Sequence, residues 1–152
     1  MKFIISLLIP LAVGGISGFF TVKAIPGWYA RLNKPWFNPP NWLFSPVWTS
    51  LYIMMGIALW LVWKSDAPQK LKQRAIYLFA AQLVLNFFWS LIFFNLHQIG
   101  WALVEIIAMW GMILFSILAF AKVNKAAAWL QVPYISWVSF ATILNYSIWQ
   151  LN

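Results

Sequence analysis

Very few side chains in this sequence are suited to acid–base or metal chemistry. The 152 residues include only two acids, Asp66 and Glu105, a single histidine, His97, and no cysteine. Hydrolytic catalysis needs a positioned acid, base or activated nucleophile, and metal sites need clustered ligands. Because no such set is present, we expect no catalytic residues, no metal site and no resident cofactor, which argues against a conventional enzyme.

Glu105 and His97 are both solitary. Glu105 follows Gly100 by five residues, or ~7–8 Å along a helix, so we expect it to reach the membrane interface or pair with a basic residue of the first loop. A proton relay would need a chain of ionisable partners, which is missing. His97 has no ligand-type neighbour, so we interpret it as a solvated loop residue, with axial ligation of haem as the alternative.

Aromatic and amide side chains are the remaining candidates for binding. Several recur at the spacing of one helical face. These faces hold Gln82, Asn86, Trp89 and Phe93; Trp137, Ala141, Leu144 and Ile148; Trp48, Tyr52 and Met55; and Trp101, Glu105 and Ala108. Large aromatics beside amides and small residues suit a cavity for a flat, mostly apolar ligand. Ordinary packing between helices explains the same spacing equally well.

The elements that would position these faces are long apolar segments. Hydrophobic residues make up 64% of the chain and charged residues 8%, against roughly 45–50% and 25% in soluble domains. Five runs reach the ~20 residues that a helix needs to cross a bilayer, at residues 3–22, 42–63, 75–96, 99–121 and 126–151. We predict an all-α membrane protein, a bundle of five transmembrane helices forming one domain over residues 1–152. The first run is too long for a signal peptide, so we interpret it as a retained helix.

The connections between these helices differ in character. The first loop, residues 23–41, contains Pro26, Pro35, Pro39 and Pro40, which stiffen it. Its aromatics belong either to an interfacial belt or to a cover over a cavity. The second loop, residues 64–74, is polar and basic, and the third is very short. In the first helix, Gly14 and Gly18 form a GxxxG motif, which predicts close helix contact within the chain or, alternatively, a homodimer face.

The net charge of +8 has a topological explanation. The Lys and Arg residues lie between the apolar runs, so they do not indicate nucleic-acid binding. Seven fall on the side of the N-terminus and three on the other side. We expect an integral protein of a bacterial cell membrane, surrounded by lipid. In such a membrane the positive-inside rule predicts a cytoplasmic N-terminus.

Several motifs resemble a known family. They occur in order along nearly the whole chain: Trp28-Tyr29-Ala30, Lys34-Pro35, Pro39-Pro40 with Trp42, Pro46-Val47-Trp48, Leu85-Asn86 with Trp89, Ile92-Phe93-Phe94, Gly100-Trp101-Ala102-Leu103-Val104-Glu105, Pro133-Tyr134 with Trp137, and Phe140-Ala141-Thr142 with Leu144-Asn145-Tyr146 and Trp149. Together they resemble the translocator protein family, whose bacterial members are tryptophan-rich sensory proteins and whose animal members are peripheral benzodiazepine receptors.

This resemblance implies a pocket inside the five-helix bundle, covered by the first loop. By motif match, its ligand-binding positions are Tyr29, Trp48, Asn86, Trp89, Trp101, Trp137, Ala141 and Leu144. The family binds porphyrins, including protoporphyrin IX and haem, and benzodiazepine-type ligands. The implied function is a membrane receptor or carrier in tetrapyrrole homeostasis or stress sensing. The enzymatic alternative is light-dependent degradation of the porphyrin, assisted by pocket tryptophans.

The sequence departs from the family pattern in three places. The usual loop tryptophan is replaced by Phe37, with Trp36 one residue earlier. A proline pair found on the third helix of many members is Ser90-Leu91 here, which predicts a straighter helix. Animal members also bind cholesterol, but the recognition motif needs a Lys or Arg soon after Tyr146. No basic residue follows Tyr146, so the case for sterol binding is weak.

Overall fold

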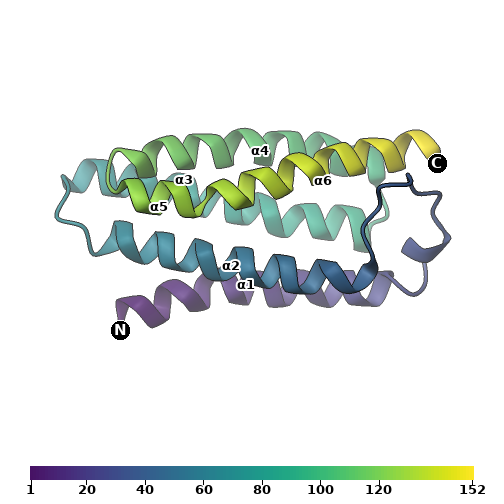
Figure 1. Ribbon diagram of the computed structural model, residues 1–152, viewed down its shortest axis with the longest axis horizontal. Coiled ribbons are helices and arrows are strands. Elements are labelled where there is room, and N and C mark those ends of the chain that lie inside the picture. Colours follow the sequence, from purple (N-terminus) through teal and green to yellow (C-terminus); the bar gives the residue numbers. More distant parts are fainter.

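Five helical spans long and apolar enough to cross a membrane run side by side in this computed structural model, which describes residues 1–152 (Figure 1). The predicted all-α membrane bundle is confirmed, and there are no strands. The elements are α1 (Lys2–Ala24), η1 (Tyr29–Arg31), α2 (Asn41–Trp63), α3 (Gln69–Ser90), η2 (Leu91–Asn95), α4 (Ile99–Ala121), α5 (Lys125–Leu130) and α6 (Val132–Leu151).

The predicted start of the third helix was wrong. The apolar run begins at residue 75, but α3 begins at Gln69 and includes the basic segment up to Arg74. Pro68 precedes it with an extended backbone, and its carbonyl oxygen accepts from the amide of Leu71 at 3.0 Å. Gln, Lys, Leu and Arg are all good helix formers. Hydrophobicity therefore marks where the membrane begins, and the helix continues beyond it.

The third span also ends irregularly. Regular α-helix stops at Ser90, and Leu91–Asn95 form a π-helical turn in which the Leu96 amide donates to the Leu91 carbonyl at 2.9 Å. His97 then adopts a left-handed conformation with φ 57°, which histidine tolerates better than most residues. The wider turn interrupts the α-helix without any proline, and the expected straighter helix at Ser90-Leu91 stays a prediction.

The last span is two helices rather than one. α5 and α6 meet at Gln131, whose amide donates to Ala128 at 3.1 Å. Pro133 follows as the second residue of α6. Proline lacks an amide hydrogen and its ring crowds the carbonyl four residues earlier, so a continuous helix through this point is disfavoured. The break redirects the chain before the face that carries Trp137 and Ala141.

Close packing between α1 and α2 depends on two glycines. A Cβ added at Gly56 would lie 2.8 Å from the Leu7 backbone, and a Cβ added at Gly14 would overlap the Tyr52 ring. For Gly14 this confirms the prediction of helix contact within the chain. At Gly18 no atom lies within 4 Å of an added Cβ, so that end of the GxxxG motif is open.

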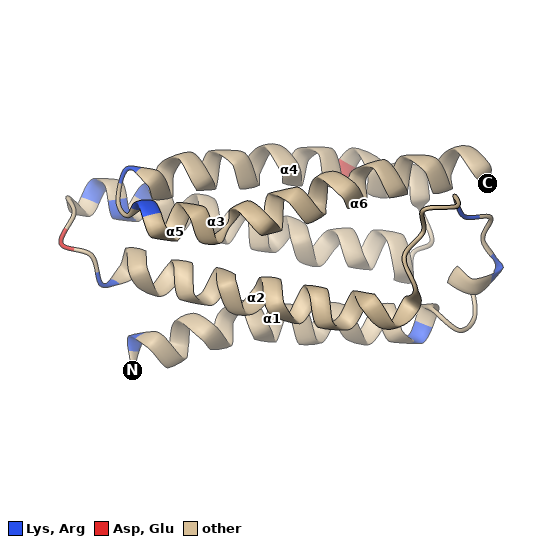
Figure 2. Ribbon diagram, viewed as in Figure 1, with Lys and Arg blue, Asp and Glu red and all other residues tan.

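Charge is confined to the two ends of the bundle, with one exception (Figure 2). The exception is Glu105 on α4, whose two carboxylate oxygens are buried without a hydrogen-bond partner. The expected pairing of Glu105 with a basic residue of the first loop is therefore not formed.

Candidate functional site

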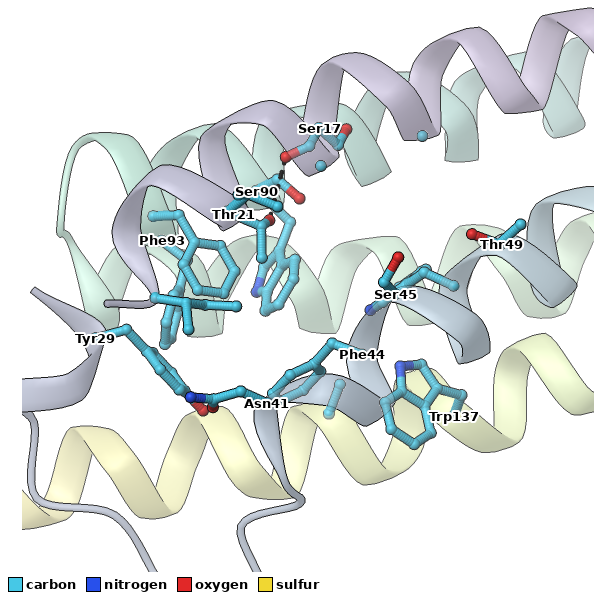
Figure 3. Close-up of a pocket in the computed structure, with 18 of the residues that line it drawn as sticks. Ser17, Thr21, Tyr29, Asn41, Phe44, Ser45, Thr49, Ser90, Phe93 and Trp137 are labelled. Atoms are coloured by element: carbon cyan, nitrogen blue, oxygen red, sulfur yellow. Dashed lines mark hydrogen bonds between the residues drawn. The ribbon is translucent and has the colours of Figure 1, made fainter. Parts of the chain in front are cut away.

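A cavity of about 380 Å³ lies within the bundle, near the end covered by the first loop (Figure 3). Its walls come from α1, α2, the end of α3 with η2, and α6, and η1 contributes Tyr29. Ligand pockets typically measure roughly 300–1,000 Å³, so this cavity is at the small end of that range.

Most of the predicted site residues meet at this cavity. Its lining includes the predicted residues Tyr29, Trp48, Trp89, Trp137, Ala141 and Leu144. They come from four separate segments, η1, α2, α3 and α6. Ligand binding by these side chains stays a prediction, but they do share one space.

Asn86 lies behind the cavity wall rather than on it. Its side-chain oxygen accepts from the Tyr52 hydroxyl at 2.6 Å, and its amide nitrogen donates to the Tyr134 hydroxyl at 2.9 Å. Tyr134 in turn donates to Gln82 at 2.6 Å. This chain of hydrogen bonds joins α2, α3 and α6 inside the bundle. The Asn86 side chain is thus already occupied, and only Tyr52 connects the network to the cavity.

Trp101 lies outside the cavity altogether. Its side chain is 68% exposed, on the outer surface of α4. It borders a shallow outer groove together with Leu96 and Glu105. The position is typical of an aromatic residue at the membrane interface.

The inner wall of the cavity is built around Trp48. Its ring centroid lies 5.7 Å from that of Tyr52, 6.4 Å from Trp89 and 6.5 Å from Trp137. These separations are within the range of favourable aromatic pairs. Trp89 is further held by a 3.1 Å hydrogen bond from its indole nitrogen to Asn145. The tryptophans therefore form a connected wall whose orientation is set before any ligand arrives.

Tyr29 closes the cavity at the first loop. The Tyr29 hydroxyl donates to the Asn38 side-chain oxygen at 2.8 Å, and the side chain is 2% exposed. Burial raises the pKa of Tyr29 to about 12, although the Asn38 hydrogen bond acts in the opposite direction. The Lys34 ammonium donates to the carbonyls of Tyr29 and Leu32 at 2.8 and 3.1 Å. Lys34 thus fixes the loop backbone behind Tyr29.

The first loop is fastened to the bundle at two further points. Asn33 and Asn152 exchange hydrogen bonds: the Asn33 amide donates to the Asn152 side chain at 3.1 Å, and the Asn152 side chain donates to the Asn33 carbonyl at 2.9 Å. On the other side, Trp28 stacks on His97, with ring centroids 4.2 Å apart and planes 9° apart. The loop behaves as a fastened cover, as one of the two sequence-based interpretations expected.

Comparison with known proteins identifies the family. Residues 6–150 match the sequence pattern of the TspO/MBR family. The chain belongs to the TspO/MBR family. It is 47% identical to the tryptophan-rich protein TspO of Chlorobaculum tepidum, over 93% of this chain and 90% of that protein. The translocator protein of Ovis aries is 39% identical over 89% and 83%. The tryptophan-rich sensory protein of Cereibacter sphaeroides is 38% identical over 82% and 77%.

The α1 wall of this TspO/MBR cavity was missed by sequence reasoning, which treated the first helix only as a packing element. It contributes small and hydroxyl side chains, among them Gly14, Ser17, Gly18 and Thr21. Their spacing of three and four residues marks one helical face. In a helix with few other polar residues, that stripe was the available signal.

The cavity of this family member is suited to stacking and hydrogen bonding rather than to acid–base chemistry. Its lining includes no Asp, Glu, Lys, Arg, His, Cys or Met. Polar atoms come from hydroxyls and amides, including those of Ser45, Thr49, Ser90 and Asn145. Such a lining favours a flat, largely apolar ligand with a few hydrogen-bonding groups.

Proposed function

We propose that this TspO/MBR protein is a membrane receptor or carrier for porphyrins, acting in tetrapyrrole homeostasis or stress sensing. The observation that carries the proposal is an uncharged cavity inside the membrane bundle whose wall includes the rings of Trp48, Trp89 and Trp137. The names of its relatives, translocator protein and tryptophan-rich sensory protein, support a transport or sensory role. Benzodiazepine-type ligands are proposed for the same cavity, since they too are aromatic and mostly apolar.

The proposed ligand pose follows from the wall. A macrocycle would lie against Trp48 and Trp137 and pass over Ala141, where a methyl group permits close approach. Its carboxylates would leave the apolar region toward the first loop, where Arg31 is exposed. Lys34 is a poorer partner than the sequence indicated, because its ammonium group already donates to two loop carbonyls.

Metal-free protoporphyrin is the favoured porphyrin. Iron in haem takes axial ligands such as His, Cys, Met or a Tyr phenolate, and the first three are missing from the lining. The two lining phenols, Tyr29 and Tyr52, both donate to asparagine side chains. A tyrosine phenol is already neutral at physiological pH, and burial raises the pKa of Tyr29 further, to about 12. Haem bound here would lack a protein ligand to its iron.

Titration of the protein in liposomes, in darkness, tests this proposal. Quenching of tryptophan fluorescence by protoporphyrin IX should saturate, and substitution of Trp48 or Trp137 by Ala should weaken binding several-fold. An aromatic pair contributes about 0.5–1.5 kcal/mol beyond the area it buries. Trp129→Ala, on the exposed surface of α5, is the matched control. Unchanged affinity in both cavity variants would contradict the proposed site.

Light-dependent porphyrin degradation is the second candidate function. The observation that favours it is the connected wall in which Trp48 lies within 6.5 Å of both Trp89 and Trp137. An excited porphyrin against this wall has indole electron donors at contact distance, and dioxygen would serve as the oxidant. Illumination in air should then bleach the absorbance of bound protoporphyrin faster in the native protein than in the Trp48→Phe variant. Equal bleaching rates would reject the degradation candidate, and the receptor or carrier function would remain.

Membrane placement is also proposed. The protein would reside in a bacterial cell membrane with its N-terminus in the cytoplasm, because seven of the ten Lys and Arg residues lie at the end that holds the N-terminus (Figure 2). A homodimer stays a proposal as well, and it needs a face other than Gly14, which packs against Tyr52.

A further inference from the structure

The cavity wall between α1 and α2 is incomplete. Gly15 and Val22 on α1, and Asn41, Ser45 and Thr49 on α2, line the cavity and are at the same time exposed. A residue that both lines a cavity and remains exposed lies at an opening. These five residues all belong to the two helices that face each other on this side of the bundle.

The two helices pack closely only at the opposite end. Gly56 of α2 touches the α1 backbone at Leu7, and Gly14 of α1 touches Tyr52. Beyond Gly14, toward the first loop, α1 presents Gly15 and Gly18, and no atom lies within 4 Å of a Cβ added at either position. Figure 3 shows Ser45 and Thr49 on α2 across an open space from Ser17 and Thr21 on α1.

The end of the cavity toward the first loop is closed by comparison. Tyr29 is buried and hydrogen-bonded to Asn38. The loop is fastened to the bundle through Asn33 with Asn152, and through the stack of Trp28 on His97. Entry by this route requires these contacts to break, whereas no atom lies within 4 Å of a Cβ added at Gly15 or Gly18 beside the opening between α1 and α2.

We propose that the opening between α1 and α2 is a lateral portal through which ligands enter the cavity from the lipid phase. Both helices span the membrane, so the portal faces acyl chains rather than water. It selects apolar molecules that dissolve in the bilayer and are thin enough to pass edge-on. Gly15 and Gly18 set its width, because any side chain there occupies the open space. The identity of the natural ligand rests on the proposed function, but the portal itself does not.

A single cysteine inside the cavity provides a test that does not depend on porphyrin binding. The native chain has no cysteine, so Ser90→Cys places the only thiol on the cavity wall. The protein in liposomes is exposed to N-(1-pyrenyl)maleimide, a flat apolar probe that dissolves in lipid. Adding Gly18→Leu should slow labelling by about tenfold or more, within the span over which mutations change association rates.

Gly111→Leu on α4 is the matched control, because an added Cβ at Gly111 also meets no atom within 4 Å and Gly111 is remote from the cavity lining. It should leave the labelling rate within about twofold of the parent. An unchanged rate in the Gly18→Leu variant, with folding verified by thermal unfolding, would overturn the portal.

A loosened first loop tests the competing route. Asn33→Ser with Asn152→Ser removes one of the two fastenings, the hydrogen bonds between the loop and Asn152. This variant should leave the labelling rate unchanged, whereas entry beneath the first loop would make labelling faster. The same variants are then titrated with protoporphyrin IX. Saturable binding with slower association and slower dissociation in Gly18→Leu supports both proposals. If Gly18→Leu slows maleimide labelling as expected but no variant binds porphyrin, the proposed function is rejected and the portal is retained.

Discussion

At the level of single residues, Ala141 best separates ligand binding from packing. It lines the cavity one helical turn beyond Trp137 and is 7% exposed. Ala141→Leu would fill space that the proposed ligand needs, and overpacking of this kind typically costs ~1–3 kcal/mol. We predict a larger loss of protoporphyrin affinity than of thermal stability, measured on the same preparation. A well-folded variant with full affinity would show that the ligand does not pass over this face.

Asn86 should behave in the opposite way. It joins Tyr52 and Tyr134 by hydrogen bonds and lies outside the cavity lining. Asn86→Ala would leave the buried Tyr52 hydroxyl without its acceptor and would remove one of the two hydrogen bonds of the Tyr134 hydroxyl. An unsatisfied buried polar group costs about 1–3 kcal/mol. The unfolding temperature should therefore fall clearly, while the ligand affinity of the folded protein changes little. Gln150→Ala, which removes an exposed amide on α6, is the control and should unfold at the same temperature as the native protein.

The buried phenol of Tyr29 should make the folded protein less stable at alkaline pH. Burial raises the pKa of Tyr29 to about 12 from the model-compound value of 10.0. Between these values the unfolded chain releases its proton while the folded chain retains it, so folding becomes less favourable as pH rises. Stability should be fully present below about pH 10 and decline through about pH 12. Phenolate absorbance and the unfolding temperature can be followed against pH in the native protein and in Tyr29→Phe. An identical alkaline decline of the unfolding temperature in the two proteins would contradict the prediction.

Spacing identified helical faces correctly but could not say which of them turns inward. Trp137 and Trp101 each lie on a helical face that also holds small or polar residues. Only the packing of α4 against α3 and α6 leaves Trp101 outside and Trp137 inside. In a membrane protein both environments are apolar, so hydrophobicity does not distinguish a lipid-facing side chain from a cavity-facing one.

At the level of elements, the polar beginning of α3 is directly testable. Arg74 lies inside the helix that begins at Gln69, although the apolar run starts after it. Proline inside a helix costs about 3 kcal/mol. Arg74→Pro should therefore destabilise the protein by about that amount in chemical unfolding. Asp66→Pro, in the connection before α3, should have little effect on the free energy of unfolding. An equally small effect of Arg74→Pro would mean that the helix starts later.

The ends of elements were predictable only where membrane and helix boundaries coincide. α4 occupies residues 99–121 as predicted, since a short turn precedes it and basic residues follow it. The π turn after Ser90 and the break at Gln131 depend instead on local backbone hydrogen bonds. Neither changes the hydropathy of its segment, so an analysis based on apolar length could not detect them.

At the level of the whole molecule, the asymmetry of charge predicts the orientation. Lys70 lies at the end of the bundle with the N-terminus, and Gln98 lies at the end with the first loop. Since the chain has no native cysteine, Lys70→Cys and Gln98→Cys can be labelled individually in intact bacterial cells. A membrane-impermeant maleimide should reach only the cysteine at position 98. Labelling of position 70 alone would invert the proposed orientation.

The peripheral position of α1 has a consequence for how the protein is assembled. Most of its side chains face outward, and its buried residues are only Ser6, Pro10, Ser17 and Ala24. The hairpin of α3 and α4, joined by a very short connection, can associate independently of it. In the two-stage view, helices insert first and dock afterwards. We therefore expect α1 to dock late. Until α1 docks, the other helices can be inserted and largely assembled, but the bundle lacks the α1 wall of its binding site.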